Sequence, residues 1–163
     1  MRIRKKKWAQ PELDACSFFV NNPEELKGKW ADFFCEAKPL ELGVGCGKGT
    51  FVAEKALRNP DINFIAMDIK SDMLGVGRRN IVKRFEEAGR EVKNIALVAH
   101  NVDKIFEVIG EDDKIDRIYI NFCDPWHKTK HAKRRLTHRR YIELYQSLLP
   151  QHWFHSTAAH CGA

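Results

Sequence analysis

Leu40-Glu-Leu-Gly-Val-Gly-Cys-Gly-Lys-Gly49 is the stretch that decides the fold of this 163-residue chain. It begins as a short apolar strand over 40–44 and runs into a turn in which every second residue is glycine. Glycine tolerates positive φ and lets a ligand approach the backbone closely. A helical pattern follows at once over 50–58, so the stretch is typical of a strand–turn–helix unit in an α/β protein.

Outward from this stretch, strand and helix patterns alternate along the chain. Further strands are expected over 63–67, 94–99 and 115–121, and helices over 24–36, 50–58, 71–88, 102–109 and 137–149. The alternation predicts a parallel sheet flanked by helices. Gly75 and Gly77 lie inside the helix expected over 71–88, where each costs roughly 1 kcal/mol against alanine, and only close packing would account for them.

Polar residues follow the ends of these strands, where ligands of parallel α/β sheets bind. They are the segment 41–49, Asp68, Asn101 and Asp124. The glycine turn matches neither the phosphate-binding loop nor the dinucleotide fingerprint in spacing, so alone it names no ligand. Asp68 lies 19 residues after Gly49, where it can accept hydrogen bonds from both hydroxyls of a ribose. Helix N-capping is its alternative role.

A dense basic segment follows the last expected strand. Asp124-Pro125-Trp126 comes first, and residues 125–142 then hold seven Lys and Arg and no acid. Residues 1–7 hold five more cations and no acid, while the rest of the chain has 16 Lys and Arg against 22 Asp and Glu. Such segregation favours a polyanionic partner over a general effect on solubility, although two solvated surfaces would give the same composition.

These motifs occur in the order of a known family. The chain reads Leu-Glu-Leu-Gly…Gly-Lys-Gly-Thr-Phe, then Asp-Ile-Lys-Ser71, then His-Asn101, then Asn-Phe-Cys-Asp-Pro-Trp-His-Lys-Thr-Lys-His-Ala-Lys-Arg-Arg-Leu136. It resembles the bacterial tRNA (guanine-N7-)-methyltransferases, from about residue 22 to residue 150. The resemblance implies a Rossmann-like fold, S-adenosylmethionine as cofactor, tRNA as partner, and methyl transfer to N7 of a guanosine.

The resemblance also implies roles for individual residues. The cofactor would be bound by Glu41, Gly43, Gly45, Gly47, Asp68, Asn101 and Asp124, with Asp124 also taken as the catalytic residue at the junction with the target base. RNA would be bound by Lys128, Lys130, His131, Lys133, Arg134 and Arg135.

Two departures from the family pattern concern the turn and the tail. The segment 41–49 is two residues longer than the usual Glu-x-Gly-x-Gly-Lys-Gly, which leaves open which glycines touch the cofactor. After Pro150 the family continues with further strands, whereas residues 151–163 contain no Lys, Arg, Asp or Glu and show no strand or helix pattern. We expect a basic arm over 1–23, an incomplete methyltransferase domain over 24–150 that lacks its last strands, and an atypical tail produced by a frame change or truncation.

Other functions stay open at this point. Asp124-Pro125-Trp126 is also similar to the Asp-Pro-Pro-Tyr motif of amino-methyltransferases that act on adenine, although the second proline is missing. A non-catalytic RNA-binding domain would explain the charge but not the polar residues at strand ends. Cys123, His127 and His131 have the spacing of metal ligands, but Pro125 breaks a helix there and no fourth ligand follows, so no metal is expected at these residues.

The cellular setting follows from composition. The five cysteines are scattered without a CxxC pair, and no apolar run approaches about 20 residues. We therefore expect a cytoplasmic protein without a membrane span, either a monomer or a homodimer.

Overall fold

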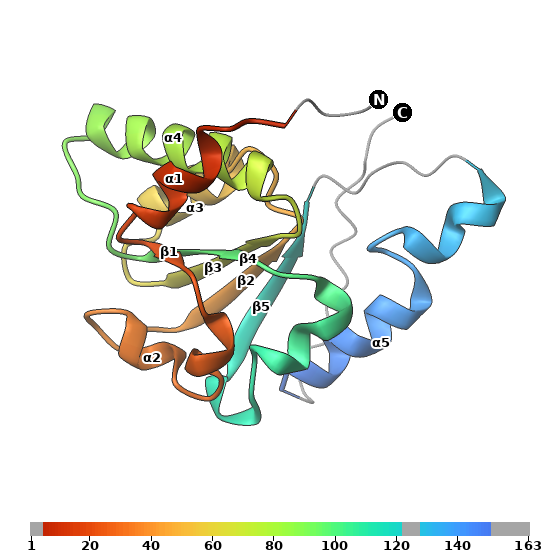
Figure 1. Cartoon of the computed structure of the whole chain (residues 1–163). Helices are drawn as coiled ribbons and strands as arrows, with labels where there is room; N and C mark the ends of the chain where they lie inside the picture. Colours follow the sequence, from red (N-terminus) through yellow and green to blue (C-terminus); the bar gives the residue numbers. More distant parts are fainter. Residues whose placement is uncertain (1–4, 122–127, 151–163) are drawn as a thin grey trace.

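The computed structural model describes residues 5–121 and 128–150 (Figure 1). One parallel sheet runs through it, with the strand order β1–β4–β3–β2–β5. The elements in chain order are α1 (Ala9–Asp14), β1 (Phe19–Val20), the 3-10 helix η1 (Pro23–Leu26), α2 (Trp30–Phe33), β2 (Leu40–Val44), α3 (Thr50–Arg58), β3 (Asn63–Asp68), α4 (Ser71–Glu87), β4 (Ile95–Ala99), η2 (Val102–Glu107), η3 (Glu111–Asp113), β5 (Ile115–Ile120), η4 (Thr129–Arg134) and α5 (Arg139–Leu148).

The strand order reverses direction between β2 and β5. From β2 the chain passes through α3 to β3 and through α4 to β4, each strand lying beside the previous one. The next strand, β5, then pairs with the other side of β2. The carboxyl ends of β2 and β5 are therefore the topological switch point, where open α/β sheets bind their ligands.

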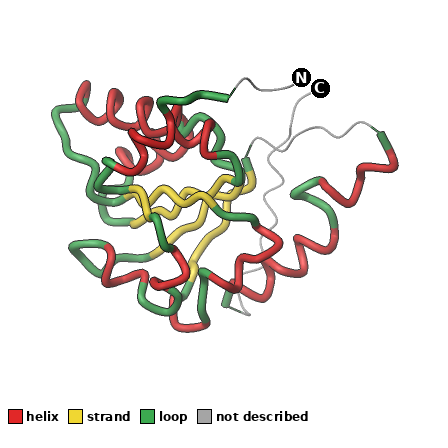
Figure 2. The backbone as a smooth tube through the Cα atoms, in the orientation of Figure 1, coloured by secondary structure: helices red, strands yellow, loops and turns green. Residues whose placement is uncertain are grey.

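Helices cover both faces of the sheet, so its central strands β2 and β3 are buried along nearly their whole length (Figures 1 and 2). One face packs against α1, α3 and α4 through residues such as Leu13, Ala56, Leu74 and Phe85. The other face packs against α2, η2 and α5; its core includes Trp30, Ile105, Tyr141 and Tyr145. The predicted parallel α/β architecture is confirmed.

Close packing explains the two glycines within α4. A Cβ atom on Gly75 would lie 2.6 Å from the Cβ of Ala9 in α1. A Cβ atom on Gly77 would lie 3.3 Å from the carbonyl oxygen of Gly47 in the glycine turn. The two glycines thus let α4 approach α1 on one side and the turn on the other.

From about Trp8 onward, the structure has a helix and a strand where the sequence predicted a basic N-terminal arm. Residues Ala9–Asp14 form α1, and Phe19–Val20 add a strand beside β4. The Arg79 guanidinium stacks 3.5 Å over the Trp8 ring and bonds Glu12, which fixes α1 on α4. A two-residue strand shows no alternation that the sequence could have revealed.

The single helix expected over 24–36 is also wrong. Two short helices, η1 and α2, replace it, with Gly28 between them at φ +75°. The buried Asp113 carboxylate accepts hydrogen bonds from the backbone N–H groups of Gly28 and Trp30, at 2.7 and 3.1 Å. This tertiary contact, made across more than 80 residues of sequence, replaces the local helix.

Within 5–121 and 128–150, no helix has the length and apolarity that crossing a membrane requires.

Candidate active site at the carboxyl end of the sheet

The glycine turn closes tightly over the ends of β2 and β3. Gly45, Gly47 and Gly49 all have positive φ, at 69°, 54° and 70°. The N–H groups of Gly45 and Cys46 both donate to the carbonyl oxygen of Met67, at 2.9 and 3.1 Å. A Cβ on Gly45 would lie 2.6 Å from the carbonyl oxygen of Asn121, so only glycine fits there.

Gly43 has a different position from the three turn glycines. It lies within β2, between Ala66 of β3 and Tyr119 of β5 in the sheet register, and its φ is not positive. It lines a small cavity below the turn together with Cys46, Phe51, Val52, Phe64, Tyr119 and Asn121.

Asp68 lies at the end of β3, directly against the turn. Its Oδ2 accepts a hydrogen bond from Gly47 N at 2.9 Å, and its Oδ1 accepts one from Lys70 N at 3.0 Å. The side chain is half-buried. The N-cap residue of α4 is Lys70, and no side chain caps that helix. Asp68 therefore braces the turn and the approach to α4 rather than capping the helix.

Asn101 lies at the adjacent strand end. His100 N donates to the carbonyl oxygen of Asp68 at 3.1 Å, which ties the residue after β4 to the end of β3. The Oδ1 atom of Asn101 accepts a hydrogen bond from Asp103 N at 3.0 Å and so caps η2. The cap fixes the Asn101 side chain one strand away from Asp68, as the sequence predicted.

Glu41 does not reach the carboxyl edge of the sheet. It is the second residue of β2, and 5% of it is exposed. Its Oε2 accepts a hydrogen bond from the hydroxyl of Tyr119 at 2.9 Å, and Arg117 donates to the same hydroxyl at 3.3 Å. The carboxylate thus links β2 to β5 below the glycine turn.

The end of β5 meets the turn from the other side. Asn121 N donates to the carbonyl oxygen of Val44 at 3.1 Å, so the chain leaves β5 beside the first turn residue. Asp124, three positions further on, lies outside the described residues, as do Cys123 and His127.

The predicted RNA-binding segment returns to the same turn. The predicted RNA-binding side chains belong to Lys128, to the 3-10 helix η4 and to Arg135, which follows η4. Lys128, Lys130, Lys133 and Arg134 are exposed, while His131 and Arg135 are half-buried. Leu136, which follows the segment, has its Cδ1 atom 3.1 Å from the position of a Cβ on Gly45. The residue that follows the basic segment therefore packs beside the glycine turn.

Cys46 is the one thiol within the turn, and it is inert. Burial raises the pKa of this thiol far above its usual range, and the nearby charge of Asp68 raises it further. A protonated, buried thiol is a poor nucleophile and a poor metal ligand.

Known proteins resemble this chain along most of its length. A family described as "Putative methyltransferase" matches residues 37–157. A tRNA (guanine-N(7)-)-methyltransferase of Clostridium beijerinckii is 56% identical over 149 residues, covering 91% of this chain and 68% of that protein. One of Clostridium botulinum strain Alaska E43 is 51% identical over 157 residues, covering 94% and 72%.

The chain belongs to the tRNA (guanine-N7-)-methyltransferase family.

Among solved structures, an antibiotic-related methyltransferase aligns with a TM-score of 0.48 at 14% identity, covering 91% of this chain and 61% of that one. At that score the likeness adds nothing to what the strand order shows.

The sequence did not predict several features of this chain. The partnership of Tyr119 with Glu41 was not foreseen, although alternation along 115–120 places Arg117 and Tyr119 on one face of the strand. The contact of Leu136 with Gly45 has no sequence signal, because it depends on how η4 returns. The structure brings together the turn glycines, Asp68, Asn101 and the basic segment, and it sets Glu41 and Gly43 below them.

Proposed function

We propose that this chain transfers a methyl group from S-adenosylmethionine to N7 of a guanosine in tRNA, as the names of its relatives state for those proteins. The observation that carries the proposal is the junction at the switch point. There a glycine turn braced by Asp68 touches Leu136, the residue that ends a basic segment. A cofactor on the turn and an RNA on the segment would share one edge of the sheet.

The residues of the turn fit an adenosyl cofactor. Three glycines with positive φ leave the backbone open to close approach, and Asp68 keeps a half-exposed carboxylate that can accept from ribose hydroxyls. Asn101, fixed by its own cap, would lie beside the adenine. The cofactor supplies an electrophilic methyl group on a sulfonium.

The transfer needs orientation more than a base. N7 of guanine has a free in-plane lone pair and loses no proton when it attacks carbon. The protein therefore has to hold the purine in line with the methyl group and to tolerate positive charge on the ring. We assign that position to Asp124, whose carboxylate would offset the charge or hold the N–H edge of the guanine.

The basic segment would bind the phosphate backbone of the RNA. Exposed Lys128, Lys130, Lys133 and Arg134 can contact phosphates, together with the half-buried His131 and Arg135. Phosphate contacts give affinity and salt dependence but read little sequence. A cytoplasmic location belongs to the same proposal, since the substrate is tRNA.

The test uses unmodified tRNA and a methyl-labelled cofactor. We expect label in 7-methylguanosine; label in adenine would support the amino-methyltransferase instead, and no cofactor binding at all would leave an RNA-binding domain. In calorimetry, Asp68→Ala should weaken binding of S-adenosylhomocysteine by about 1.5–3 kcal/mol, the usual worth of hydrogen bonds to a charged group.

Asp72→Ala is the matched control for the Asp68 variant. Asp72 is another half-buried carboxylate, in the first turn of α4, and it accepts a backbone hydrogen bond from Lys6 N at 3.1 Å. Both variants lose one charge and backbone hydrogen bonds, two at Asp68 and one at Asp72, and only Asp68 lies on the turn. Equal affinities for the two would reject the ribose-binding role of Asp68.

A further inference from the structure

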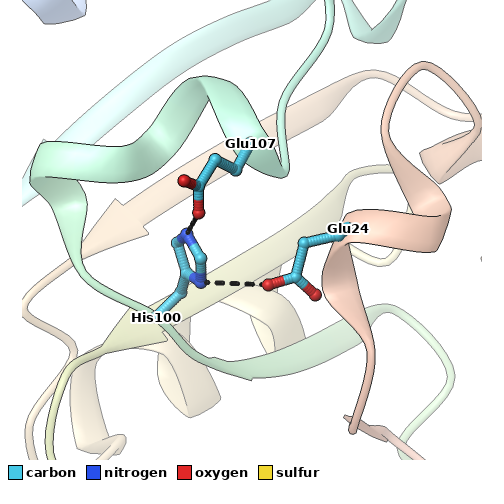
Figure 3. A group of neighbouring side chains, drawn as sticks. All are labelled: Glu24, His100 and Glu107. Carbon is cyan, nitrogen blue, oxygen red and sulfur yellow. Dashed lines mark ion pairs between the residues drawn. The ribbon is translucent and has the colours of Figure 1, made fainter.

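His100 lies between two carboxylates at the carboxyl end of β4 (Figure 3). Glu24 comes from η1 and Glu107 from η2. The His100 side chain is 10% exposed, whereas those of Glu24 and Glu107 are 55% and 50% exposed. One donor atom from each of the three lies within 4.8 Å of the others. The methyl transfer proposed above uses none of these side chains.

The ring nitrogens of His100 have different surroundings. Nε2 lies 3.1 Å from the carbonyl oxygen of Lys104, which places the proton of a neutral ring on Nε2. Nδ1 then carries a lone pair and faces Glu24 Oε1 at 3.8 Å. A second ring proton on Nδ1, or a cation between the two groups, would remove the repulsion between this lone pair and the carboxylate.

The distance between Nδ1 and Oε1 exceeds that of a hydrogen bond and leaves room for an ion. A hydrogen bond would bring the two atoms to roughly 2.7–3.2 Å. Two ligands of one tetrahedral zinc ion, each with a bond of about 2.1 Å, lie about 3.4 Å apart. The observed 3.8 Å is longer than either separation, so the exposed Glu24 side chain has to move closer before both atoms can bind one ion.

We propose that Glu24, His100 and Glu107 bind a zinc ion, through Nδ1 of the histidine and one oxygen of each carboxylate. Imidazole with two carboxylates is a ligand set that zinc accepts, with water completing the shell. The hydrogen bond from Nε2 to the Lys104 carbonyl is the outer contact that orients metal-binding histidines.

Glu107 faces Nε2 and has to move to the Nδ1 side of the ring to join the ion (Figure 3). Its Oε2 lies 3.6 Å from Nε2, and its Oε1 lies 3.7 Å from the Lys104 ammonium group. Both side chains are at least half exposed, so rotation of the carboxylate toward Nδ1 meets little resistance. Once bound, the ion would join η1 to η2 across the residue next to Asn101.

The experiment is calorimetric titration of the full chain with zinc chloride, compared with four variants. His100→Ala should abolish the site, and Glu24→Gln should weaken it about tenfold or more. Glu25→Gln is the matched control, because Glu25 is also an exposed acid of η1 but lies outside the group. It should leave the affinity unchanged. Cys35→Ser, which removes an exposed thiol, should do the same.

Zinc binding is measured without cofactor or RNA, so its outcome does not depend on the methyltransferase proposal. Zinc affinity that is equal in Glu24→Gln and Glu25→Gln, or absent in the wild type, would overturn the site. Affinity lost only with Cys35→Ser would assign the zinc to thiols and overturn it too. If His100→Ala does not fold, Glu24→Gln and Glu107→Gln decide, since both change exposed side chains.

Discussion

The two sides of the glycine turn are built differently. On one side, β3 and β4 are buried along nearly their whole length, between α1, α3 and α4 on one face and α2 and η2 on the other. On the other side, β5 is buried only at Ile115, and its neighbour η4 has no buried residue. We call β1 to β4 with α1, α3 and α4 the cofactor half, and β5, η4 and α5 the substrate half.

The buried cofactor half contributes most to stability, whereas the exposed substrate half carries the side chains suited to binding. The cofactor half excludes water, so packing holds its polar residues in fixed places. The substrate half presents Lys and Arg to solvent, where a polyanion can reach them. Within the described residues, β5 pairs with β2 alone, along Leu40–Val44. Besides that pairing, the halves meet where Tyr119 contacts Glu41, Phe51 and Lys55, where Asn121 N donates to Val44, and where Leu136 lies beside Gly45.

The largest effect is expected at Gly45, where the halves meet most closely. Alanine there adopts positive φ and drives its Cβ into the carbonyl oxygen of Asn121, 2.6 Å away. Backbone strain and overpacking together should lower the free energy of unfolding by about 3 kcal/mol. Chemical denaturation measures this value.

Gly89→Ala is the matched control for that variant. Gly89 also has positive φ, at 66°, but a Cβ there would meet nothing within 4 Å. The Gly89→Ala substitution should lower the free energy of unfolding only by the backbone strain, about 1 kcal/mol. If both variants lose the same free energy, the close approach of the two halves contributes nothing.

A smaller effect is expected from Tyr119→Phe, which removes the hydroxyl that donates to the buried Glu41 carboxylate. Leaving that carboxylate without its donor should cost about 1–3 kcal/mol. In the Glu41→Gln background the same change should cost less, because no charge is then left unpaired. A cost that is identical in both backgrounds would show that the hydroxyl acts through packing and not through Glu41.

The sequence predicted most elements of both halves, including β5 and α5 of the substrate half, but it missed α1 and β1 of the cofactor half. Apolar runs identified β2, β3 and β4 and placed Asp68 and Asn101 at neighbouring strand ends, because parallel strands end at one edge. The roles of Gly75 and Gly77 required knowing which backbone lies opposite. The break at Gly28 depended on Asp113, which is remote in sequence. The position of the basic segment depended on Leu136, and the sequence showed only its charge.

The smallest effect on stability, and a large one on RNA binding, is expected from replacing Lys128, Lys130 and Lys133 together with alanine. All three are exposed, and surface substitutions of this kind change unfolding by less than about 0.5 kcal/mol. If each contacts a phosphate, the slope of log affinity against log salt should fall by roughly 2 to 3 units for tRNA.

Removal of Lys27, Lys29 and Lys93 is the matched control, since it deletes three exposed cations outside the substrate half. If this control lowers the slope as much, RNA binding follows net charge and is not localised at η4. If the salt slope stays constant while the free energy of unfolding falls, the basic segment stabilises the fold. The assignment of RNA binding to the substrate half is then wrong.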